Sequence, residues 1–395
     1  MLKVALVALN GVHATSGHAE AGPLGQGVLD TAQALAAHGH RITVYARRDS
    51  PSQPAMVTLD SGVVIEYLRA GPATRLPADK LGQHLRQFAD ELAERWRRDR
   101  PDVAHAFFWT GGLAALAVTR EQQVPVVQTF FSLGAAEHRY HLPDHGPAGR
   151  IRLEASIART VATVLAASTE ETADLAGLGV PQAAVRIVPW GVDTAQFTPD
   201  GPAMKRGRRQ RVVAFGPLAP SQGLETVIRA LAQVPEAELV VIGGPHRRQL
   251  RTQPYYRTLA GLAASAGIRQ RVTFAGRVAE GDLPAWLRSA DLVVSAAPYD
   301  PYGTATLQAM ACGIPVIAPG VGASQDAVID GTTGMLVPPD HPRLLAQRIR
   351  ELLAAPVRRG AYGAAAADRA RSRYSWERVS QETLTAYQHS AQLAG

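Results

Sequence analysis

The chain has 395 residues, of which 46% are hydrophobic and 19% charged, and its formal net charge at pH 7 is +7. This length fits two domains of about 150–200 residues each, and the composition excludes an intrinsically disordered chain. The single cysteine, Cys312, excludes a disulfide framework and a metal site built from cysteines.

The first part of the chain alternates short apolar runs with amphipathic stretches. The apolar runs predict strands at residues 3–9, 41–45, 63–67, 103–106, 124–129, 161–166 and 186–188. The intervening stretches predict helices at residues 25–37, 79–98, 111–120, 150–159 and 169–177. This alternation indicates a parallel sheet covered by helices on both faces, so residues 1–192 are expected to form a doubly wound domain.

A polar connector interrupts the pattern at residues 193–210, where Pro199, Gly201 and Pro202 precede a basic cluster. We expect this segment to be a linker and a hinge. Beyond it, strands are predicted at residues 211–215, 238–242, 272–274, 292–295 and 315–318, and helices at 221–232, 255–266, 282–289, 304–311, 342–353 and 361–393. Residues 211–374 are therefore expected to form a second doubly wound domain, and residues 375–395 a helix that packs back on the first.

The expected fold class is α/β, with two Rossmann-like domains facing each other across a cleft that binds ligands at the carboxyl ends of the strands. The apolar run at residues 3–9 is too short to span a membrane and no small-residue cleavage site follows it, so we expect a cytoplasmic protein without a transmembrane segment. The basic clusters at 95–98 and 205–209 are short, as is typical of a solvated helix face and a solvated linker. Nucleic acid is therefore not expected as a partner.

Residues 298–318 carry the strongest local signal. A loop with Pro301 and Gly303 leads into a helix predicted to start at Thr304, and a Gly-Ile-Pro turn then leads into a buried strand. Backbone N–H groups at a helix start are suited to hold an anion, and the hydroxyl groups of Thr304 and Thr306 would add donors. On spacing alone, a plain loop–helix–strand unit is an equal alternative.

This segment resembles the E-x7-E region of the family-4 retaining glycosyltransferases of GT-B fold. The resemblance extends over nearly the whole chain, in the first-domain strand, the segment that joins the domains, the Gly-Gly loop and the start of the last helix. The segments that carry it are residues 39–47, 100–105, 188–199, 241–245, 330–339 and 374–376.

The resemblance implies an enzyme that transfers a sugar, with retention, from a nucleotide-sugar donor to a small-molecule acceptor. It implies no metal and no cofactor beyond the donor. It places the donor in the second domain, with Asp300 in the catalytic position and the acceptor or sugar on the first-domain side. The donor residues would be Gly216, Gln222, Gly243, Gly244, Arg277, Val278, Gly303, Thr304 and Gln308. The residues on the other side would be Gly22, His105, Thr129 and Phe131.

The chain departs from the family pattern at the residues that neutralise the donor diphosphate. The family reads G-R-x4-K-G after the first strand of the second domain, whereas this chain has Pro217 for the arginine and Gln222 for the lysine. Charge on the leaving diphosphate makes electrostatic stabilisation the largest expected catalytic effect. His246, Arg247 and Arg248 are candidate substitutes, although a solvated helix start is the favoured explanation for them.

Other family positions differ as well. Asp300 and Gln308 stand where relatives have two glutamates, Phe131 replaces a histidine, and Pro23 lies where a Gly-Gly loop is usual. The differences concentrate in the site while the scaffold motifs are kept, which indicates a changed ligand or a lost activity. The alternative function is therefore a catalytically silent homologue that acts as a binding or scaffold partner.

Other site classes find weak or no support. His138, His141 and His145 form a loop cluster, but no carboxylate stands at metal-ligand spacing beside them, so no metal is expected. The sequence has no G-x-G-x-x-G, P-loop or G-x-S-x-G pattern, which excludes the usual dinucleotide, NTPase and hydrolase motifs.

Overall fold

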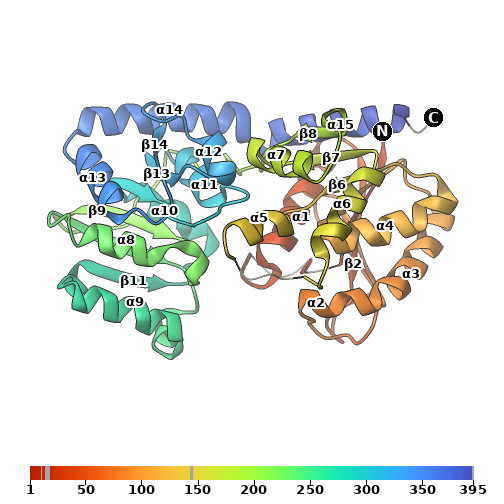
Figure 1. Cartoon of the computed structure of the whole chain (residues 1–395), viewed down its shortest axis with the longest axis horizontal. Helices are drawn as coiled ribbons and strands as arrows, with labels where there is room; N and C mark the ends of the chain where they lie inside the picture. Colours follow the sequence, from red (N-terminus) through yellow and green to blue (C-terminus); the bar gives the residue numbers. More distant parts are fainter. Residues whose placement is uncertain (10, 14–17, 143–145, 394–395) are drawn as a thin grey trace. The chain divides into compact units, whose positions relative to one another are not determined.

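The computed structural model describes residues 1–9, 11–13, 18–142 and 146–393, without the side chains of residues 18–24, 78, 392 and 393. The chain divides into two compact units, shown in Figure 1. The first comprises Met1–Val188 and Val379–Gly395, and the second comprises Pro189–Arg378. The chain therefore passes between the units twice, after Val188 and after Arg378.

The sheet of the first unit has the strand order β3-β4-β2-β1-β5-β6-β7-β8 among the described residues. Its neighbouring strands pair in parallel except for β3, which runs antiparallel to β4 at the edge. The strands are β1 Lys3–Ala8, β2 Arg41–Arg47, β3 Met56–Thr58, β4 Val64–Leu68, β5 Val103–Phe107, β6 Val126–Thr129, β7 Thr163–Ala166 and β8 Val185–Ile187. The sequence did not predict β3, because a three-residue edge strand leaves almost no periodic signal.

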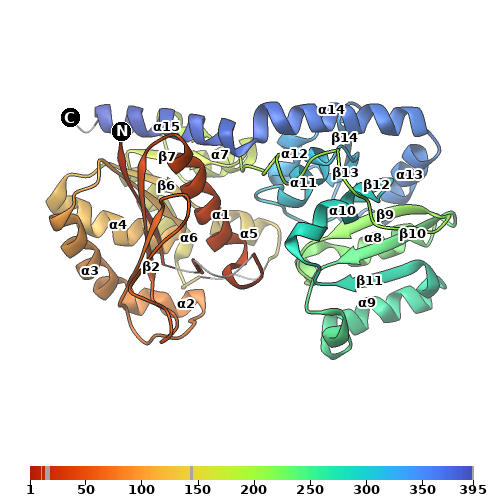
Figure 2. The same ribbon diagram turned by 180° about the vertical axis from the view of Figure 1, so that it is seen from behind.

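Apart from α5, which was not predicted, the helices of the first unit lie where the sequence predicts them, although not always with the predicted length. They are α1 His18–Ala37, α2 Ala78–Leu81, α3 Leu85–Arg98, α4 Phe108–Gln122, α5 Gly134–Arg139, α6 Arg150–Thr160 and α7 Thr169–Gly177, and the 3-10 turns are η1 Gly82–His84 and η2 Gln182–Ala184. Figure 2 shows α1 beside β1 and β2. Because α1 begins at His18, Gly22 lies within a helix, and the prediction of a loop there is wrong. The structure does not describe the side chains of residues 18–24, so the contacts around Gly22 are not described either.

The second unit is built around a sheet with the order β11-β10-β9-β12-β13-β14, in which all neighbouring strands are parallel. The strands are β9 Gln210–Phe215, β10 Ala237–Ile242, β11 Val272–Gly276, β12 Leu292–Val294, β13 Val316–Pro319 and β14 Gly334–Val337. From β9, the next two strands along the chain, β10 and β11, are added on one side of the sheet, and β12, β13 and β14 are then added on the other side of β9. The order thus reverses between β9 and β12, the place where doubly wound sheets bind ligands.

The helices of the second unit cover both faces of this sheet. They are α8 Leu224–Leu231, α9 Pro254–Ser265, α10 Leu283–Arg288, α11 Thr304–Ala311, α12 Gly322–Ala327, α13 Pro342–Leu353 and α14 Pro356–Tyr374, with the 3-10 turns η3 Pro220–Gln222, η4 Arg247–Thr252, η5 Arg269–Arg271 and η6 Glu280–Asp282. Along β9, Val212 and Ala214 pack into a core with α8, α9 and α13, whereas Val213 packs into another core with α10, α11 and α14. Both faces of the strand are buried, which explains its unbroken apolar run.

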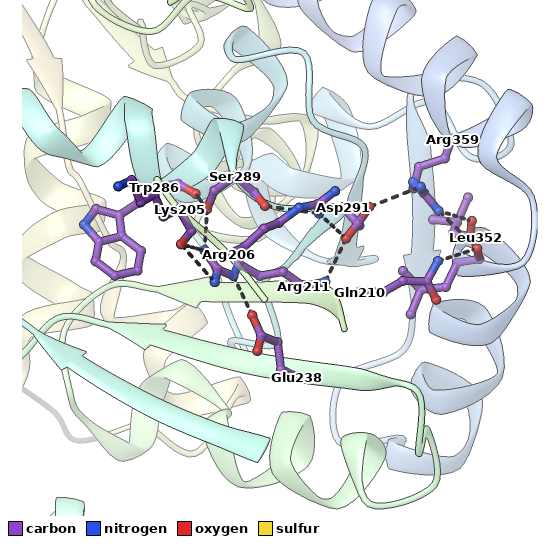
Figure 3. A network of polar contacts seen from close by, with 11 residues as sticks. Lys205, Arg206, Gln210, Arg211, Glu238, Trp286, Ser289, Asp291, Leu352 and Arg359 are labelled. Atoms are coloured by element: carbon purple, nitrogen blue, oxygen red, sulfur yellow. Dashed lines mark hydrogen bonds and ion pairs between the residues drawn. The ribbon is translucent and has the colours of Figure 1, made fainter. Parts of the chain in front are cut away.

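Residues 193–210 belong to the second unit rather than lying free between the domains. Figure 3 shows how they are held: the carboxyl group of Asp291 accepts hydrogen bonds from the Arg206 guanidinium and the Arg211 N–H group, and it also pairs with Arg359. Earlier in the segment, the Arg288 guanidinium donates to the carbonyl groups of Thr198 and Pro202. The segment is thus bonded to the second unit along its length, which differs from the predicted hinge.

The helical stretch predicted at residues 361–393 is two helices: α14 ends at Tyr374, and α15 Trp376–Leu393 begins after Ser375, close to the start expected for the last helix. Beyond Arg378 the chain is part of the first unit. There the hydroxyl groups of Ser380, Tyr387 and Ser390 bond with His38, His105 and Thr163. Among the described residues, none of the helices is both long and apolar enough to span a bilayer.

Candidate functional site

A small pocket of the second unit lies where the strand order reverses, at the carboxyl ends of β9, β10 and β12. It is lined by Ala214, Phe215, Gly216, Pro217, Gln222, Leu224, Val241, Ile242, Val294, Ser295 and Ala296. Two of the predicted donor residues, Gly216 and Gln222, are therefore in its wall. The sequence alone did not single out Ser295 and Ala296, which follow β12.

Glycines let the loops around this pocket approach one another closely. Gly243 has a φ of 135°, and a Cβ atom there would lie 1.8 Å from the Gly216 carbonyl oxygen. Gly223 has a φ of 62°, and a Cβ atom there would lie 1.8 Å from the Ala296 carbonyl oxygen. Larger residues fit neither the backbone conformation nor the space. The predicted donor glycines are thus brought to one end of the sheet.

The pocket is uncharged. Pro217 is exposed, and the Gln222 amide lies over Gly216, where an added Cβ would be 2.8 Å from the Gln222 Oε1 atom. Among the described residues that line it, none carries a cation. The side chains of Arg247 and Arg248, at the start of η4, are exposed. They are the arginines that follow the Gly-Gly loop, and they are not part of the pocket wall.

Arg277 and Val278 follow β11, beside the Gly-Gly loop. The Arg277 N–H group donates to the Pro245 carbonyl oxygen at 3.0 Å, which joins the two loops. The Arg277 side chain is exposed, whereas Val278 packs against the core. These contacts place both residues near Gly243 and Gly244, and they engage the Arg277 N–H group within the protein.

Asp300 holds the start of α11 through its carboxyl group. Its Oδ1 atom accepts a hydrogen bond of 2.8 Å from the Gly303 N–H group, and its Oδ2 atom accepts one of 2.9 Å from the Ser324 hydroxyl group. Burial raises the pKa of Asp300, and these hydrogen bonds oppose that shift. The carboxyl group thus has a role in shaping the loop, which its predicted catalytic position did not anticipate.

The remaining predicted phosphate ligands separate into engaged and available groups. The Gly303 N–H group is engaged by Asp300, and the buried Thr306 hydroxyl group lies 2.8 Å from that of Ser324. Thr306 therefore faces the interior, contrary to its predicted role as a donor. Thr304 is exposed at the first position of α11, and Gln308 is half-buried one turn later.

In the first unit, His105 and Thr129 are structural partners. The His105 Nε2 atom lies 2.9 Å from the Thr129 hydroxyl oxygen and its Nδ1 atom lies 2.7 Å from the Tyr387 hydroxyl oxygen. Only 2% of His105 is exposed, and burial lowers its pKa to about 3, so the ring is neutral at physiological pH. Both ring nitrogens are engaged, so the predicted position of His105 on an open acceptor side is wrong.

Two bulky residues adopt strained backbone conformations where strands of the first unit end. Phe108 follows β5 with a φ of 61°, and Phe131 lies two residues after β6 with a φ of 66°. Non-glycine residues with such angles are uncommon, and they gather at functional sites. Phe131 is buried and its ring lies 5.6 Å from that of Phe107, so it fills space rather than offering the polar group of the family histidine.

Buried charges near these residues escaped the sequence analysis. The Arg150 guanidinium pairs with Glu137 and Glu154 and donates to the Ser132 carbonyl oxygen. Glu154 also accepts a hydrogen bond from the Gly134 N–H group, and burial raises its pKa to about 6. Together these residues fix the loop that follows Phe131. The spacing of Arg150 and Glu154 on one helix face was the available signal.

A second missed pair lies after β1 and β2. The His13 Nε2 atom is 3.2 Å from an Asp49 carboxyl oxygen, and the His13 Nδ1 atom is 3.3 Å from the Gln53 side-chain nitrogen. Neither residue belongs to a recognisable motif, so only the fold brings them together. Within the described ranges, no three His, Cys, Asp or Glu side chains form a candidate metal site, and His145 lies outside these ranges.

Comparison with known proteins identifies the family. Residues 24–196 match the model of glycosyltransferase family 4, and residues 209–355 match that of the glycosyl transferases group 1. A D-inositol 3-phosphate glycosyltransferase of Kineococcus radiotolerans is 31% identical over 421 residues, which cover 98% of this chain and 95% of that protein. The chain belongs to the family-4 glycosyltransferases.

Solved structures agree with the assignment of this chain to the glycosyltransferases. A sucrose-phosphate synthase from Thermosynechococcus elongatus is 27% identical, with a TM-score of 0.86 and coverage of 100% of this chain and 99% of that one. Anabaena Alr3699/HepE in complex with UDP and glucose is 19% identical, with a TM-score of 0.75 and coverage of 98% and 99%, which shows the fold alone. The predictions of the family, of two Rossmann-like domains and of a glycosyltransferase are confirmed.

Proposed function

We propose that this glycosyltransferase moves a sugar from a nucleotide-sugar donor, bound by the second unit, to a small-molecule acceptor with retention of anomeric configuration. The observation that carries the proposal is the pocket between β9 and β12, whose glycines bring three loop backbones together. The name of the Kineococcus relative and the UDP and glucose of the Anabaena protein support a nucleotide-sugar donor and a small hydroxylated acceptor.

The chemistry requires stabilisation of the departing nucleoside diphosphate, because negative charge builds up on it in the transition state. In this chain the pocket wall itself offers no charged group among the described residues. We assign this role to the N-terminus of α11, with its backbone N–H groups and the exposed Thr304, assisted by Arg247 and Arg248. The Gln222 amide, which donates as well as accepts, would contact the phosphate or sugar without charge.

A thermal-shift screen tests the proposal. UDP, GDP, ADP and their glucose conjugates are added to the full chain, and each positive donor is then incubated with polyols and sugar phosphates under mass spectrometry. A nucleotide at 100 times its dissociation constant stabilises the native state by about 2.7 kcal/mol, a shift that is easily measured. Stabilisation by one nucleotide and transfer from its conjugate are expected. The absence of any shift and any product would refute the proposed activity.

The uncharged pocket favours a second candidate, a catalytically silent homologue that acts as a binding or scaffold partner. The two candidates are separated by the double variant Pro217→Arg and Gln222→Lys, which restores the family cations. If the pocket has only lost charge, the variant binds nucleoside diphosphate more tightly than the wild type. If the wild-type pocket is adapted to its own donor, the variant loses native transfer activity. Gln233→Lys, on an exposed residue just beyond α8, controls for added charge.

A further inference from the structure

Three aromatic rings meet in the second unit beside the loop that precedes α11. The Trp190 ring lies 5.1 Å from that of Tyr302, with a tilt of 47°, and 5.5 Å from that of Trp376, at 71°. Trp190 also packs against the core formed by β9, β12 and α11. Rings at these distances and angles attract each other beyond the burial of their surfaces. Trp190 is therefore the central ring of the three.

The backbone around Trp190 is held firmly within the same unit. A Cβ atom on Gly191 would lie 2.4 Å from the Trp376 ring, so the chain and the ring are in direct contact. The Val192 N–H group donates to the Tyr374 carbonyl oxygen, and the Trp376 N–H group donates to the Val192 carbonyl oxygen. The Trp190 ring is thus a fixed surface against which a neighbouring side chain can pack.

Tyr302 belongs to the loop that the proposed function assigns to the donor phosphate. Asp300 anchors that loop at its base, through the Gly303 N–H group and the Ser324 hydroxyl group. The half-buried Tyr302 ring lies one residue before Gly303 and two before the exposed Thr304. The position of the Tyr302 ring therefore influences where the first N–H groups of α11 point.

The chain path gives Trp190 a second connection. The chain enters the second unit at Pro189, one residue before Trp190, and leaves it after Arg378, two residues beyond Trp376. Trp190 and Trp376, whose rings contact each other, thus belong to the two segments that join the units. Trp190 also contacts Tyr302 of the donor loop.

We propose that Trp190 is a positioning residue for the donor loop: its ring supports Tyr302 and so sets the N-terminus of α11 for the donor phosphate. The inference rests on the proposed donor site of the second unit. Truncating the ring removes the surface on which the Tyr302 ring rests. The expected loss of nucleotide affinity is about two- to tenfold, the range that aromatic pairs of this kind supply.

The test compares Trp190→Ala, Trp190→Phe and Trp286→Ala in the full chain. Trp286 is a matched control, because it is half-buried against the same core but outside the group of three rings. The probe is the nucleoside diphosphate that stabilises the wild type most, with affinity measured by calorimetry and transfer measured as separate KM and kcat values. Trp190→Ala is expected to bind the probe two- to tenfold more weakly and to raise the donor KM, whereas Trp190→Phe stays within twofold.

Hydrogen exchange of residues 298–311 provides a readout that needs no ligand. Trp190→Ala is expected to exchange faster at the start of α11, and Trp286→Ala is expected to match the wild type there. Unchanged exchange in Trp190→Ala, or equal loss of affinity in Trp286→Ala, would overturn the inference. If the wild type binds no nucleotide, the proposed function fails, and the exchange measurement still decides whether Trp190 positions the loop.

Discussion

The carboxyl group of Asp291 is predicted to be a major source of stability in the second unit. Its side chain is 8% exposed and serves three partners: the Arg211 N–H group at 2.8 Å, the Arg359 guanidinium at 3.1 Å and the Arg206 guanidinium. These partners come from β9, α14 and the segment after the first crossing (Figure 3). Asp291→Ala removes the acceptor from all of them at once.

The magnitude follows from the exposure of each partner. Arg211 is buried, so its backbone N–H group loses its acceptor without access to water, at a cost of about 1–3 kcal/mol. The Arg359 side chain is 18% exposed and keeps the carbonyl groups of Leu352 and Leu353, so its loss is about 1 kcal/mol. The Arg206 side chain is 44% exposed and contributes about 0–1 kcal/mol. The expected total is about 3 kcal/mol.

Urea unfolding monitored by circular dichroism, together with calorimetry, measures this loss. Asp291→Ala is expected to lower the Tm of the second unit by about 6–12 °C with an unchanged m-value. Asp291→Asn keeps one acceptor oxygen and should lose about half as much free energy of unfolding. Arg206→Ala is the control and should lose less than about 1 kcal/mol. The reasoning is refuted if Asp291→Ala stays within 1 kcal/mol of the wild type, or if Arg206→Ala costs as much.

Three further outcomes are expected. Tyr387→Phe leaves a His105 nitrogen unpaired in the core and should cost about 1–3 kcal/mol in urea unfolding, and an unchanged midpoint would show that the contact contributes nothing. Burial raises the pKa of Glu171 to about 7 from its usual 4.5, so the native state keeps a proton that the unfolded state loses, and stability falls as pH rises through that window. Glu171→Gln removes this slope and should gain about 3 kcal/mol on the wild type between pH 4.5 and 8, whereas parallel pH profiles would contradict the shift. Burial raises the pKa of the Cys312 thiol to about 12, so it should react with a thiol reagent at pH 8 only as the protein unfolds, and rapid labelling of the native protein would be the contrary result.

Much of the fold could be predicted because its core strands are continuous apolar runs. The strands that contain Val213 and Val293 are buried on both faces, so their sequences are continuous apolar runs of the kind typical of parallel sheets. The helices α11 and α13 begin and end where the sequence predicts. The short elements α5, α12, β3 and β14 were missed, because four to six residues, or three in β3, provide too little periodicity and depend on neighbours for their hydrogen bonds.

The candidate site was less predictable, because a motif names residue types but not their partners. The glycine loops at Gly216 and Gly243 come together as expected, since the order of the strands brings their ends to one place. Asp300 and Thr306 looked like ligand-binding residues in the motif, yet both bond with Ser324, eighteen or more residues away. Pairs such as His13 and Asp49 carry no local signal at all.

The sequence by itself determined that this protein has two alternating β/α domains, that it resembles the family-4 glycosyltransferases and that its diphosphate cations are replaced. Those properties follow from periodicity and residue identity, which are local. Only the tertiary structure decided which polar groups are already engaged, since a hydrogen bond such as that of His105 joins residues 282 positions apart. Burial and geometry, which no local pattern contains, set whether such a group serves the fold or remains available to a ligand.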